Sequence, residues 1–312
     1  MLIFYLKHPD IDKKKWDTCI ANSANELIYA HSYYLDIMSK NWDALVMCKG
    51  LPSENDYEAV MPLTWNKKFG ISYLRQPHFT QQLGIFGNIL FEKNVTELFI
   101  NKALQIFPFA EINLNYANQY KNGETKKCNL ILPLNYAFDE IEKIFRKDFV
   151  NKIRNNNLIY QPTEEIEKAI QVFRKNYDHK VHISSNSYQK WLQVSNLLKM
   201  KEQLLVRKVN SANGELLSIA MFLKDNRRIY YFLSATLPAG RNRQSHYFLL
   251  YHLIKEFSGQ NLTFDFQGSA IPSIKSFFLK FGAIEEPYPF VKINSLPIWG
   301  KWLKNSYDYF KK

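Results

Sequence analysis

Three strand-like runs in the second half of the chain constrain the fold more than any other feature. They are Leu204–Val209, Leu216–Leu223 and Arg228–Ala235, and turn signals Asn-Gly and Asp-Asn separate them. Such spacing predicts an antiparallel meander. A loop over Leu237–Gln244 follows. The sequence then predicts a helix at Ser245–Phe257, a strand at Leu262–Phe266, a helix at Ile274–Phe281 and a strand at Tyr288–Ile293. Gly282 ends the second of these helices.

The first half predicts a second mixed sheet. Helices are expected near Asp12–Met38 and at Asn94–Phe107, where apolar residues recur at helical spacing. The expected strands are Ala44–Cys48, Tyr57–Trp65, Gly70–Leu74, Glu111–Asn115 and Cys128–Leu132. An amphipathic helix is predicted at Phe138–Leu158. We therefore expect an α/β protein (α+β mixed sheet) with domains at 1–135 and 161–312 and a bridging helix at 136–160.

Composition and charge narrow the class of protein. The chain has 46% hydrophobic and 15% aromatic residues, which excludes a disordered protein. No apolar stretch approaches the ~20 residues of a membrane-spanning helix, so no transmembrane segment is expected. Cys19, Cys48 and Cys128 fit neither a disulfide framework nor a metal motif, which favours the cytoplasm. The net charge of +12 favours an anionic partner, although scattered solubilising lysines would give the same value.

Several segments resemble known acyl-transfer proteins. The element order over Leu204–Ile293 resembles the core of the GNAT acyl-CoA N-acyltransferase superfamily. The segments that resemble the Fem family of peptidoglycan-bridge aminoacyltransferases are Cys128–Leu134, Phe145–Arg154, Phe264–Ser269 and Phe277–Ala283. Met61–Gly70 and Gln76–Gly84 resemble Fem-related proteins of unassigned activity. The resemblance implies two tandem GNAT-like domains in a bacterial cytoplasmic protein that transfers an acyl or aminoacyl group to an amine.

The resemblance leaves the donor open. Acyl-CoA and aminoacyl-tRNA both carry phosphate, and neither would be a tightly bound cofactor. Fem enzymes that use tRNA commonly carry a long helical hairpin, and this sequence has no uninterrupted heptad stretch for one. Transient contact with a membrane-linked precursor is compatible with the Fem likeness. Two alternatives are a catalytically silent GNAT-fold protein that binds an anionic ligand or partner, and direct nucleic-acid binding through the basic helix at Lys143–Arg154.

The loop before the Ser245–Phe257 helix is the predicted donor site. In a GNAT-type fold the donor lies where two parallel strands part, here Arg228–Ala235 and Leu262–Phe266. A glycine, two arginines and helix N-terminal amides are the ingredients of a phosphate site. The predicted donor-binding residues are Gly240, Arg241, Arg243 and Ser245. Leu237 and Asn242 depart from the superfamily pattern of Arg or Gln and Gly or Ala, so an ordinary solvated turn is the alternative.

Asp265 is the predicted acid or base. Alternation along its strand sends Asp265 and Gln267 to the face opposite Phe264 and Phe266. A carboxylate on a central strand needs a partner to offset desolvation, so it either serves the structure or faces the cleft and orients or deprotonates the acceptor amine. On the facing strand, Ser234 and Tyr231 are predicted to donate to a carbonyl or leaving group, with core packing as the alternative.

Five polar residues are predicted to bind the acceptor substrate. They are Gln267, Ser269, Gln76, His78 and Gln81. The last three belong to a polar loop that would border an acceptor cleft between the domains, or would simply be hydrogen-bonded within its own domain. His179 and His182 have no third ligand close in sequence, so no metal site is expected.

Overall fold

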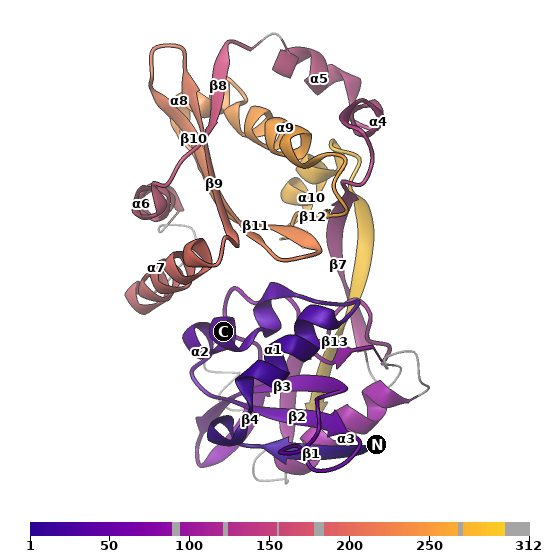
Figure 1. Cartoon of the computed structure of the whole chain (residues 1–312). Helices are drawn as coiled ribbons and strands as arrows, with labels where there is room; N and C mark the ends of the chain where they lie inside the picture. Colours follow the sequence, from indigo (N-terminus) through magenta and orange to yellow (C-terminus); the bar gives the residue numbers. More distant parts are fainter. Residues whose placement is uncertain (89–93, 121–123, 155, 178–183, 268–270, 297–312) are drawn as a thin grey trace. The chain divides into compact units, whose positions relative to one another are not determined.

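In a computed structural model, residues 1–88, 94–120, 124–154, 156–177, 184–267 and 271–296 are described (Figure 1). The chain forms two compact units, Met1–Lys127 together with the residues from Pro287 onward (unit 1) and Cys128–Glu286 (unit 2). Both are mixed α/β structures, as predicted. The expected boundaries differ from these units, because the strand predicted at Tyr288–Ile293 belongs to unit 1 and the whole 136–160 segment lies in unit 2.

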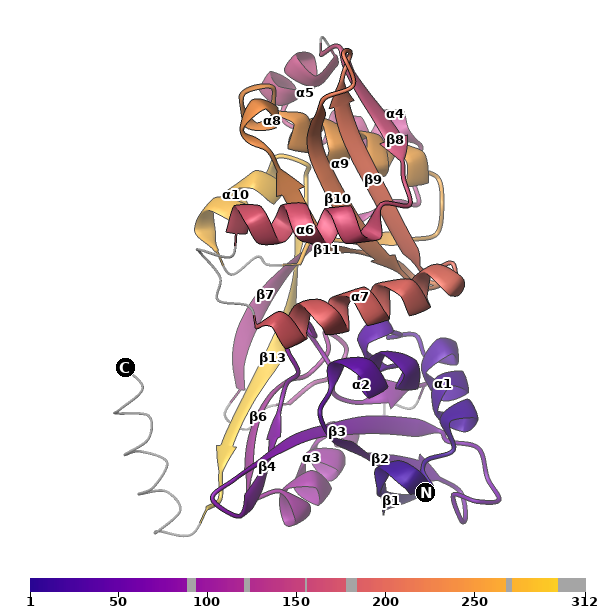
Figure 2. The same ribbon diagram turned by 90° about the vertical axis from the view of Figure 1, so that its left-hand side faces the viewer.

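Unit 1 is a mixed sheet with helices on both faces. Its strand order is β1-β2-β3-β4-β6-β13, and only the β4–β6 pair is parallel. Its strands are β1 (Leu2–Leu6), β2 (Trp42–Cys48), β3 (Ala59–Lys68), β4 (Ile71–Arg75), β5 (Phe86–Gly87), β6 (Phe109–Asn113) and, from Pro287 onward, β13 (Ile284–Asn294). Its helices are η1 (His8–Asp10), α1 (Lys13–Asn22), η2 (Ile28–Ala30), α2 (Ser32–Met38) and α3 (Val95–Ile106). The helices α1 and α2 cover one face and α3 covers the other (Figure 2).

Local sequence accounts for these elements. Asp12 begins α1 because its carboxylate accepts hydrogen bonds from the amides of Lys14 and Lys15. The apolar stripe of α3 buries Phe99 and Ala103 in the core beneath the sheet. The resulting three layers exclude water from both faces of the central strands.

A buried histidine lies between two carboxylates in unit 1. His31 Nε2 lies 3.1 Å from the buried Glu26 carboxylate, and Nδ1 lies 3.4 Å from Asp17. Burial by itself would lower the pKa of His31, but the hydrogen bonds and negative charges of Asp17 and Glu26 raise it to about 9. His31 is therefore a cation at neutral pH, and it compensates the buried charge of Glu26.

Unit 2 repeats the element order of unit 1. A strand, a helix pair, three antiparallel strands, a helix and a further strand parallel to the last of the three occur in both. The strand order of unit 2 is β7-β12-β11-β10-β9-β8. Its strands are β7 (Glu124–Pro133) from Cys128 onward, β8 (Leu158–Pro162), β9 (Leu204–Ser211), β10 (Leu216–Lys224), β11 (Arg228–Thr236) and β12 (Thr263–Asp265). Internal repetition of this kind means that one folding pattern has been used twice.

The helices of unit 2 lie on both faces of its sheet. They are α4 (Phe138–Lys143), α5 (Lys147–Arg154), α6 (Ile166–Tyr177), α7 (Ser185–Met200), α8 (Pro238–Asn242), α9 (Ser245–Phe257) and α10 (Pro272–Leu279). α6 and α7 cover one face, and α9 packs against β8, β9 and β10 on the other (Figures 1 and 2). The sequence predicted the meander, α9, β12 and α10, but it did not predict α6 and α7.

The predicted bridging helix is two helices, α4 and α5. The helix breaks because the Arg146 amide donates to the Lys280 carbonyl at the end of α10, rather than to its own helix. Ile144 lies against Gly282, where an added Cβ would meet the Ile144 side chain at 2.7 Å. Gly282 also has a φ of +69°, which favours glycine and fits its predicted role after α10. A tertiary contact therefore overrides the helical pattern.

Candidate active site in unit 2

Strands β11 and β12 part after three paired residues. The parallel pairs are Arg228↔Thr263, Ile229↔Phe264 and Tyr230↔Asp265. β12 ends at Asp265, whereas β11 continues to Thr236. The polar side chains of β11 beyond Tyr230 therefore belong to a stretch whose β12 neighbour has ended, as predicted for the donor site.

A β-bulge sets the direction of the side chains on this stretch. Met221 pairs with Leu233 and the next β10 residue, Phe222, pairs with Tyr231, so Phe232 is an extra residue on β11. Residues three apart on a regular strand point to opposite faces. Because of the extra residue, Tyr231 and Ser234, which lie three apart in the sequence, point to the same face of the sheet. The bulge thus brings together two residues that the sequence singled out.

Tyr231 is the centre of a chain of hydrogen bonds. Its hydroxyl makes a short hydrogen bond with Ser234 Oγ and lies 2.7 Å from His246 Nε2 in the first turn of α9. Burial raises the pKa of Tyr231 above its ordinary value, and burial lowers the pKa of His246 to about 4. At neutral pH this group therefore combines a protonated phenol with an uncharged imidazole. The buried Nδ1 atom of His246 has no hydrogen-bond partner among the described residues.

Aromatic rings hold the imidazole in place. His246 stacks on Phe277 of α10 with ring centroids 5.5 Å apart, and Tyr231 makes edge contacts with His246 and Phe278 at 5.7 and 5.8 Å. Apolar neighbours of this kind exclude water and strengthen the remaining polar interactions. Sequence reasoning missed His246. Its position directly after the predicted phosphate loop was the available signal.

The four predicted donor-binding residues differ in what they present to solvent. Gly240 is buried, and an added Cβ would lie 2.2 Å from the Leu217 carbonyl oxygen, so this glycine permits close packing on β10. The Ser245 hydroxyl is also buried and makes a short hydrogen bond with Ser218. Arg241 is exposed. Arg243 is half-buried and donates to the Asn157 carbonyl at 3.3 Å. Of the four, the two arginines are the residues whose polar groups a phosphate could reach.

Asp265 lies in a buried ion pair. Its carboxylate accepts from Arg228 at 3.2 Å, from Asn129 at 2.9 Å and from the Gln267 amide at 3.1 Å. Arg228 also donates two hydrogen bonds, of 2.8 and 2.7 Å, to Glu286. Burial raises the pKa of Asp265, and the charge of Arg228 opposes that rise. This geometry favours the structural alternative for Asp265, because its oxygens are already occupied within the protein.

The other predicted residues of this strand are less informative. The Gln267 side chain turns back and donates to Asp265 at 3.3 Å. Ser269 lies outside the described residues, as do His179 and His182. Within the described part of the chain, no three His, Cys, Asp or Glu residues are placed to hold a metal ion.

The corresponding strands of unit 1 part in a different way. β4 and β6 pair at Arg75↔Glu111, and the segments that follow them meet at the isolated Leu83↔Leu114 bridge, so the polar loop between Arg75 and Leu83 arches beside the end of β6. The Asn113 amide donates to Gln76 Oε1 at 3.3 Å, and its side chain donates to the Gln81 carbonyl at 2.8 Å. The backbone and side-chain amides of Asn113 thus hold both Gln76 and Gln81 of this loop in unit 1.

The remaining prediction in this loop is His78. It is exposed, and its ring lies 6.2 Å from that of Phe79, which has a φ of +59°. Left-handed backbone at a non-glycine residue is uncommon and costs energy, so the loop has a fixed conformation that the surrounding structure maintains. Gln76, His78 and Gln81 remain candidates for substrate binding by unit 1.

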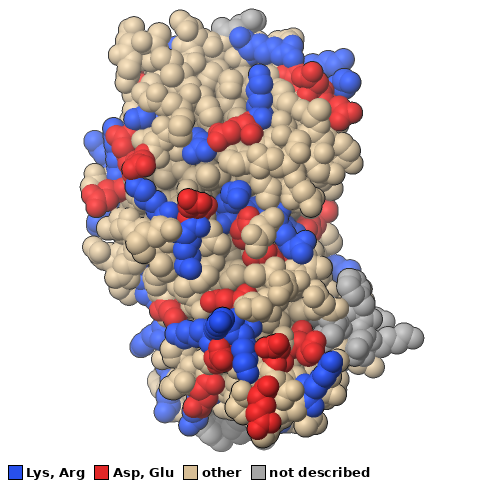
Figure 3. All heavy atoms as spheres, in the orientation of Figure 1, with Lys and Arg blue, Asp and Glu red and all other residues tan. Residues whose placement is uncertain are grey.

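Positive charge is spread over the face shown in Figure 3 rather than gathered in one patch. In the face of Figure 3, Lys and Arg side chains alternate with Asp and Glu side chains. On the basic segment at Lys143–Arg154, Arg146 is paired with Asp148 and Arg154 with Glu142. Such pairing reduces the attraction of this segment for a phosphate backbone. No helix among the described residues has both the length and the apolar composition needed to cross a bilayer.

Comparison with solved structures identifies the fold. The structure of FemX matches with a TM-score of 0.64, 10% identity, and coverage of 93% of this chain and 97% of FemX. A tandem GNAT protein from the clavulanic acid biosynthesis pathway matches with a TM-score of 0.53, 10% identity, and coverage of 95% and 99%. This chain has the tandem GNAT fold. The resemblance predicted from sequence is confirmed at the level of the fold.

A third match is a conserved protein of unknown function from Bacteroides thetaiotaomicron, with a TM-score of 0.52, 12% identity, and coverage of 90% of this chain and 96% of that one. No protein-family model matches the sequence, and no curated protein matches it either. At identities of 10–12%, these matches show that the fold is shared and show nothing about activity.

Proposed function

We propose that this protein transfers an acyl or aminoacyl group from an activated donor to an amine, and that the chemistry takes place at Tyr231 in unit 2. One observation carries the proposal. The Tyr231 hydroxyl lies just beyond the last β11–β12 pair, joined to Ser234 and His246. The tandem GNAT fold, shared with FemX and with a protein whose name mentions AcCoA, supports acyl transfer as the reaction class.

In the proposed reaction the acceptor nitrogen attacks the acyl carbon, and the bond from that carbon to the leaving sulfur or oxygen breaks. The amine loses one proton and the leaving atom gains one. Tyr231, whose raised pKa keeps the phenol protonated, gives its proton to the leaving atom and regains one from the attacking amine, so that one proton passes from the amine to the leaving atom. His246, with a pKa of about 4, is uncharged and holds the phenol oxygen through its hydrogen bond. Ser234 fixes the phenol orientation.

Phosphate on the donor would contact Arg241 and Arg243. Both acyl-CoA and aminoacyl-tRNA carry phosphate, so the arginines support either donor. Arg241 is exposed and Arg243 is held at the end of α8, one residue before the N-cap of α9. A cytoplasmic location is part of the proposal, because these donors are intracellular metabolites. In this proposal, Asp265 acts only as a positioning residue, at the point where β11 and β12 part.

Titration calorimetry with acetyl-CoA and with aminoacyl-tRNA tests donor binding. Micromolar affinity for one of them is the expected result, and mass spectrometry of a panel of amines should then detect the acylated product. Tyr231→Phe is expected to slow transfer about 100-fold or more while leaving donor affinity unchanged, because a positioned proton donor contributes on that scale. Tyr136→Phe is the matched control, since Tyr136 is an exposed tyrosine of the same unit.

Two outcomes would count against the proposal. Absence of binding to every thioester and aminoacyl-tRNA would favour the alternative, a catalytically silent GNAT-fold protein that binds another anionic ligand. Transfer that proceeds equally well in Tyr231→Phe would remove Tyr231 from the chemistry, even if the reaction class were right.

A further inference from the structure

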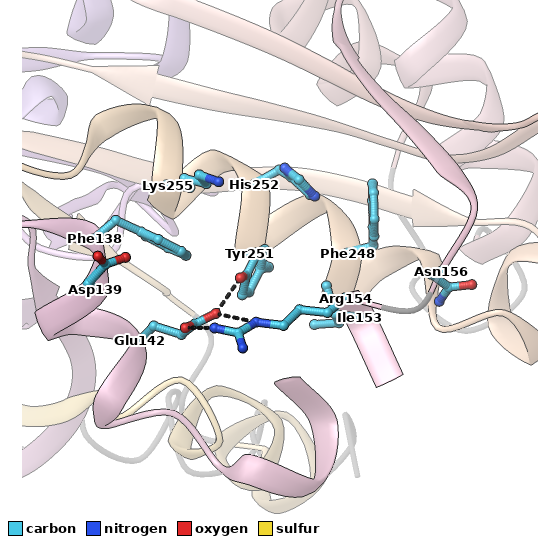
Figure 4. A pocket seen from close by; sticks show the side chains of 10 residues that line it. All are labelled: Phe138, Asp139, Glu142, Ile153, Arg154, Asn156, Phe248, Tyr251, His252 and Lys255. Atoms are coloured by element: carbon cyan, nitrogen blue, oxygen red, sulfur yellow. Dashed lines mark hydrogen bonds and ion pairs between the residues drawn. The ribbon is translucent and has the colours of Figure 1, made fainter. Parts of the chain in front are cut away.

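A pocket of about 420 Å³ lies between α9 and the helices α4 and α5 of unit 2 (Figure 4). Its volume is within the range of small-molecule sites. One wall comes from α9, at Phe248, Tyr251, His252 and Lys255. These residues have the spacing i, i+3, i+4 and i+7, so they form one face of the helix.

This pocket is separate from the Tyr231 group. Lys255 follows His246 by nine residues, which is two and a half turns of an α-helix. The two side chains therefore point to opposite sides of α9. Because His246 faces Tyr231 on β11, a ligand between α9 and α4 would not contact the Tyr231 hydroxyl.

The acidic group inside the pocket is already neutralised. Glu142 accepts hydrogen bonds from Arg154, at 3.2 Å for Nε with a second short bond from Nη2, and from the Tyr251 hydroxyl. Figure 4 shows these three side chains joined on one side of the pocket, with Lys255 and His252 on the other. The other acid of the lining, Asp139, is exposed at its edge, where solvent screens its charge.

Lys255 is the cation of this side of the pocket, and the His252 imidazole lies beside it. Lys255 lies over the Phe138 ring at 5.5 Å, and it has no ion pair with a described carboxylate. The pKa of His252 is lowered first by burial and then by the positive charge of Lys255, which shows that the two groups are neighbours. An anion placed between them would meet the Lys255 ammonium and would favour the protonated form of His252.

Aromatic rings provide the rest of the wall. His252 lies 4.3 Å from Phe248, measured between ring centroids, and stacks on Tyr160 at 5.5 Å. Phe138 meets Tyr251 edge to face at 5.1 Å. Flat apolar walls beside a cation suit a ligand that has both an aromatic ring and a negative charge.

We propose that this pocket binds a small anion that carries an aromatic ring, with its charge between Lys255 and His252 and its ring against Phe248 and Phe138. The shared chemistry covers aromatic carboxylates and mononucleotides. This binding is independent of the transfer reaction proposed above, because the pocket lies on the opposite side of α9.

Benzoate and AMP are the probes, and benzamide and adenosine are their uncharged counterparts. We expect each anion to bind at least about tenfold more tightly than its counterpart, because the charge adds a charge-assisted hydrogen bond. The stronger of the two anions identifies the source class. In NMR spectra the bound anion should shift the His252 ring signals, which are assigned by their loss in His252→Gln.

Lys255→Met is the decisive variant. Lys255 is exposed, so the substitution keeps the fold, and we expect it to weaken anion binding about tenfold while leaving benzamide and adenosine unaffected. Lys201→Met, at an exposed lysine after α7, is the control and should bind like the wild type. Equal affinity for anions and their neutral counterparts, or unchanged anion binding in Lys255→Met, would overturn the proposal.

Discussion

Removal of Arg228 should destabilise unit 2 strongly at neutral pH. The guanidinium makes three hydrogen bonds to two carboxylates, at 3.2 Å to Asp265 and at 2.8 and 2.7 Å to Glu286. The side chains are 5%, 1% and 13% exposed, so Arg228→Met would leave two buried negative charges without a cation. Breaking such a pair costs about 3 to 5 kcal/mol. For a unit of this size that corresponds to a melting temperature roughly 10 °C lower.

The pH dependence of this loss is a second measurement on the same variant. Arg228 is the group that opposes the burial-induced rise in the pKa of Asp265, so its removal raises that pKa further. A carboxyl group whose pKa is higher in the folded than in the unfolded state takes up protons on folding. Stability of the variant therefore recovers as the pH falls from neutral toward the unfolded pKa of about 4.

Guanidinium denaturation at pH 7 and pH 5, with hydrogen exchange of β11 and β12, is the assay. Arg146→Met is the matched control, because Arg146 also holds a carboxylate with two hydrogen bonds, 3.0 and 2.9 Å, but on the surface. That variant should unfold like the wild type. Arg228 is not the compensating cation of this pair if Arg228→Met loses no more stability than Arg146→Met, or if its loss is the same at both pH values.

Three further predictions concern single residues. His31, with a pKa of about 9, stabilises unit 1 fully below the unfolded pKa of about 6.5; we expect up to about 3 kcal/mol to be lost between these values, and denaturation curves at pH 6 and pH 10 check this. Gly240→Ala should lower the melting temperature, because its Cβ would meet the Leu217 carbonyl oxygen at 2.2 Å and cost about 1 to 3 kcal/mol; a wild-type melting curve would contradict the packing argument. His246, with a pKa of about 4, should remain neutral in an NMR titration from pH 8 to pH 5, and a midpoint near 6.5 would mean that the imidazole is not buried.

Much of the candidate site was predictable because it follows from short-range pattern. The turn residues between the meander strands and the glycine after α10 gave the order of elements in unit 2, and that order indicated where two parallel strands would part. Tyr231 and Ser234 could be placed on the strand that continues. Their common direction could not be predicted, because it depends on the extra residue Phe232 and on the register against β10.

The sequence by itself determined the local elements, the two-part organisation and the residue types near the parting strands, because hydrophobic spacing, turn residues and helix ends are local properties. Only the tertiary structure decided that Asp265 meets Arg228 rather than a substrate, that the predicted bridging helix breaks at Arg146, and that His246 joins Tyr231. Each of these outcomes is a contact between residues distant in the chain. Burial and hydrogen bonding at such contacts are set by which surfaces pack together, and a local pattern carries no information about that choice.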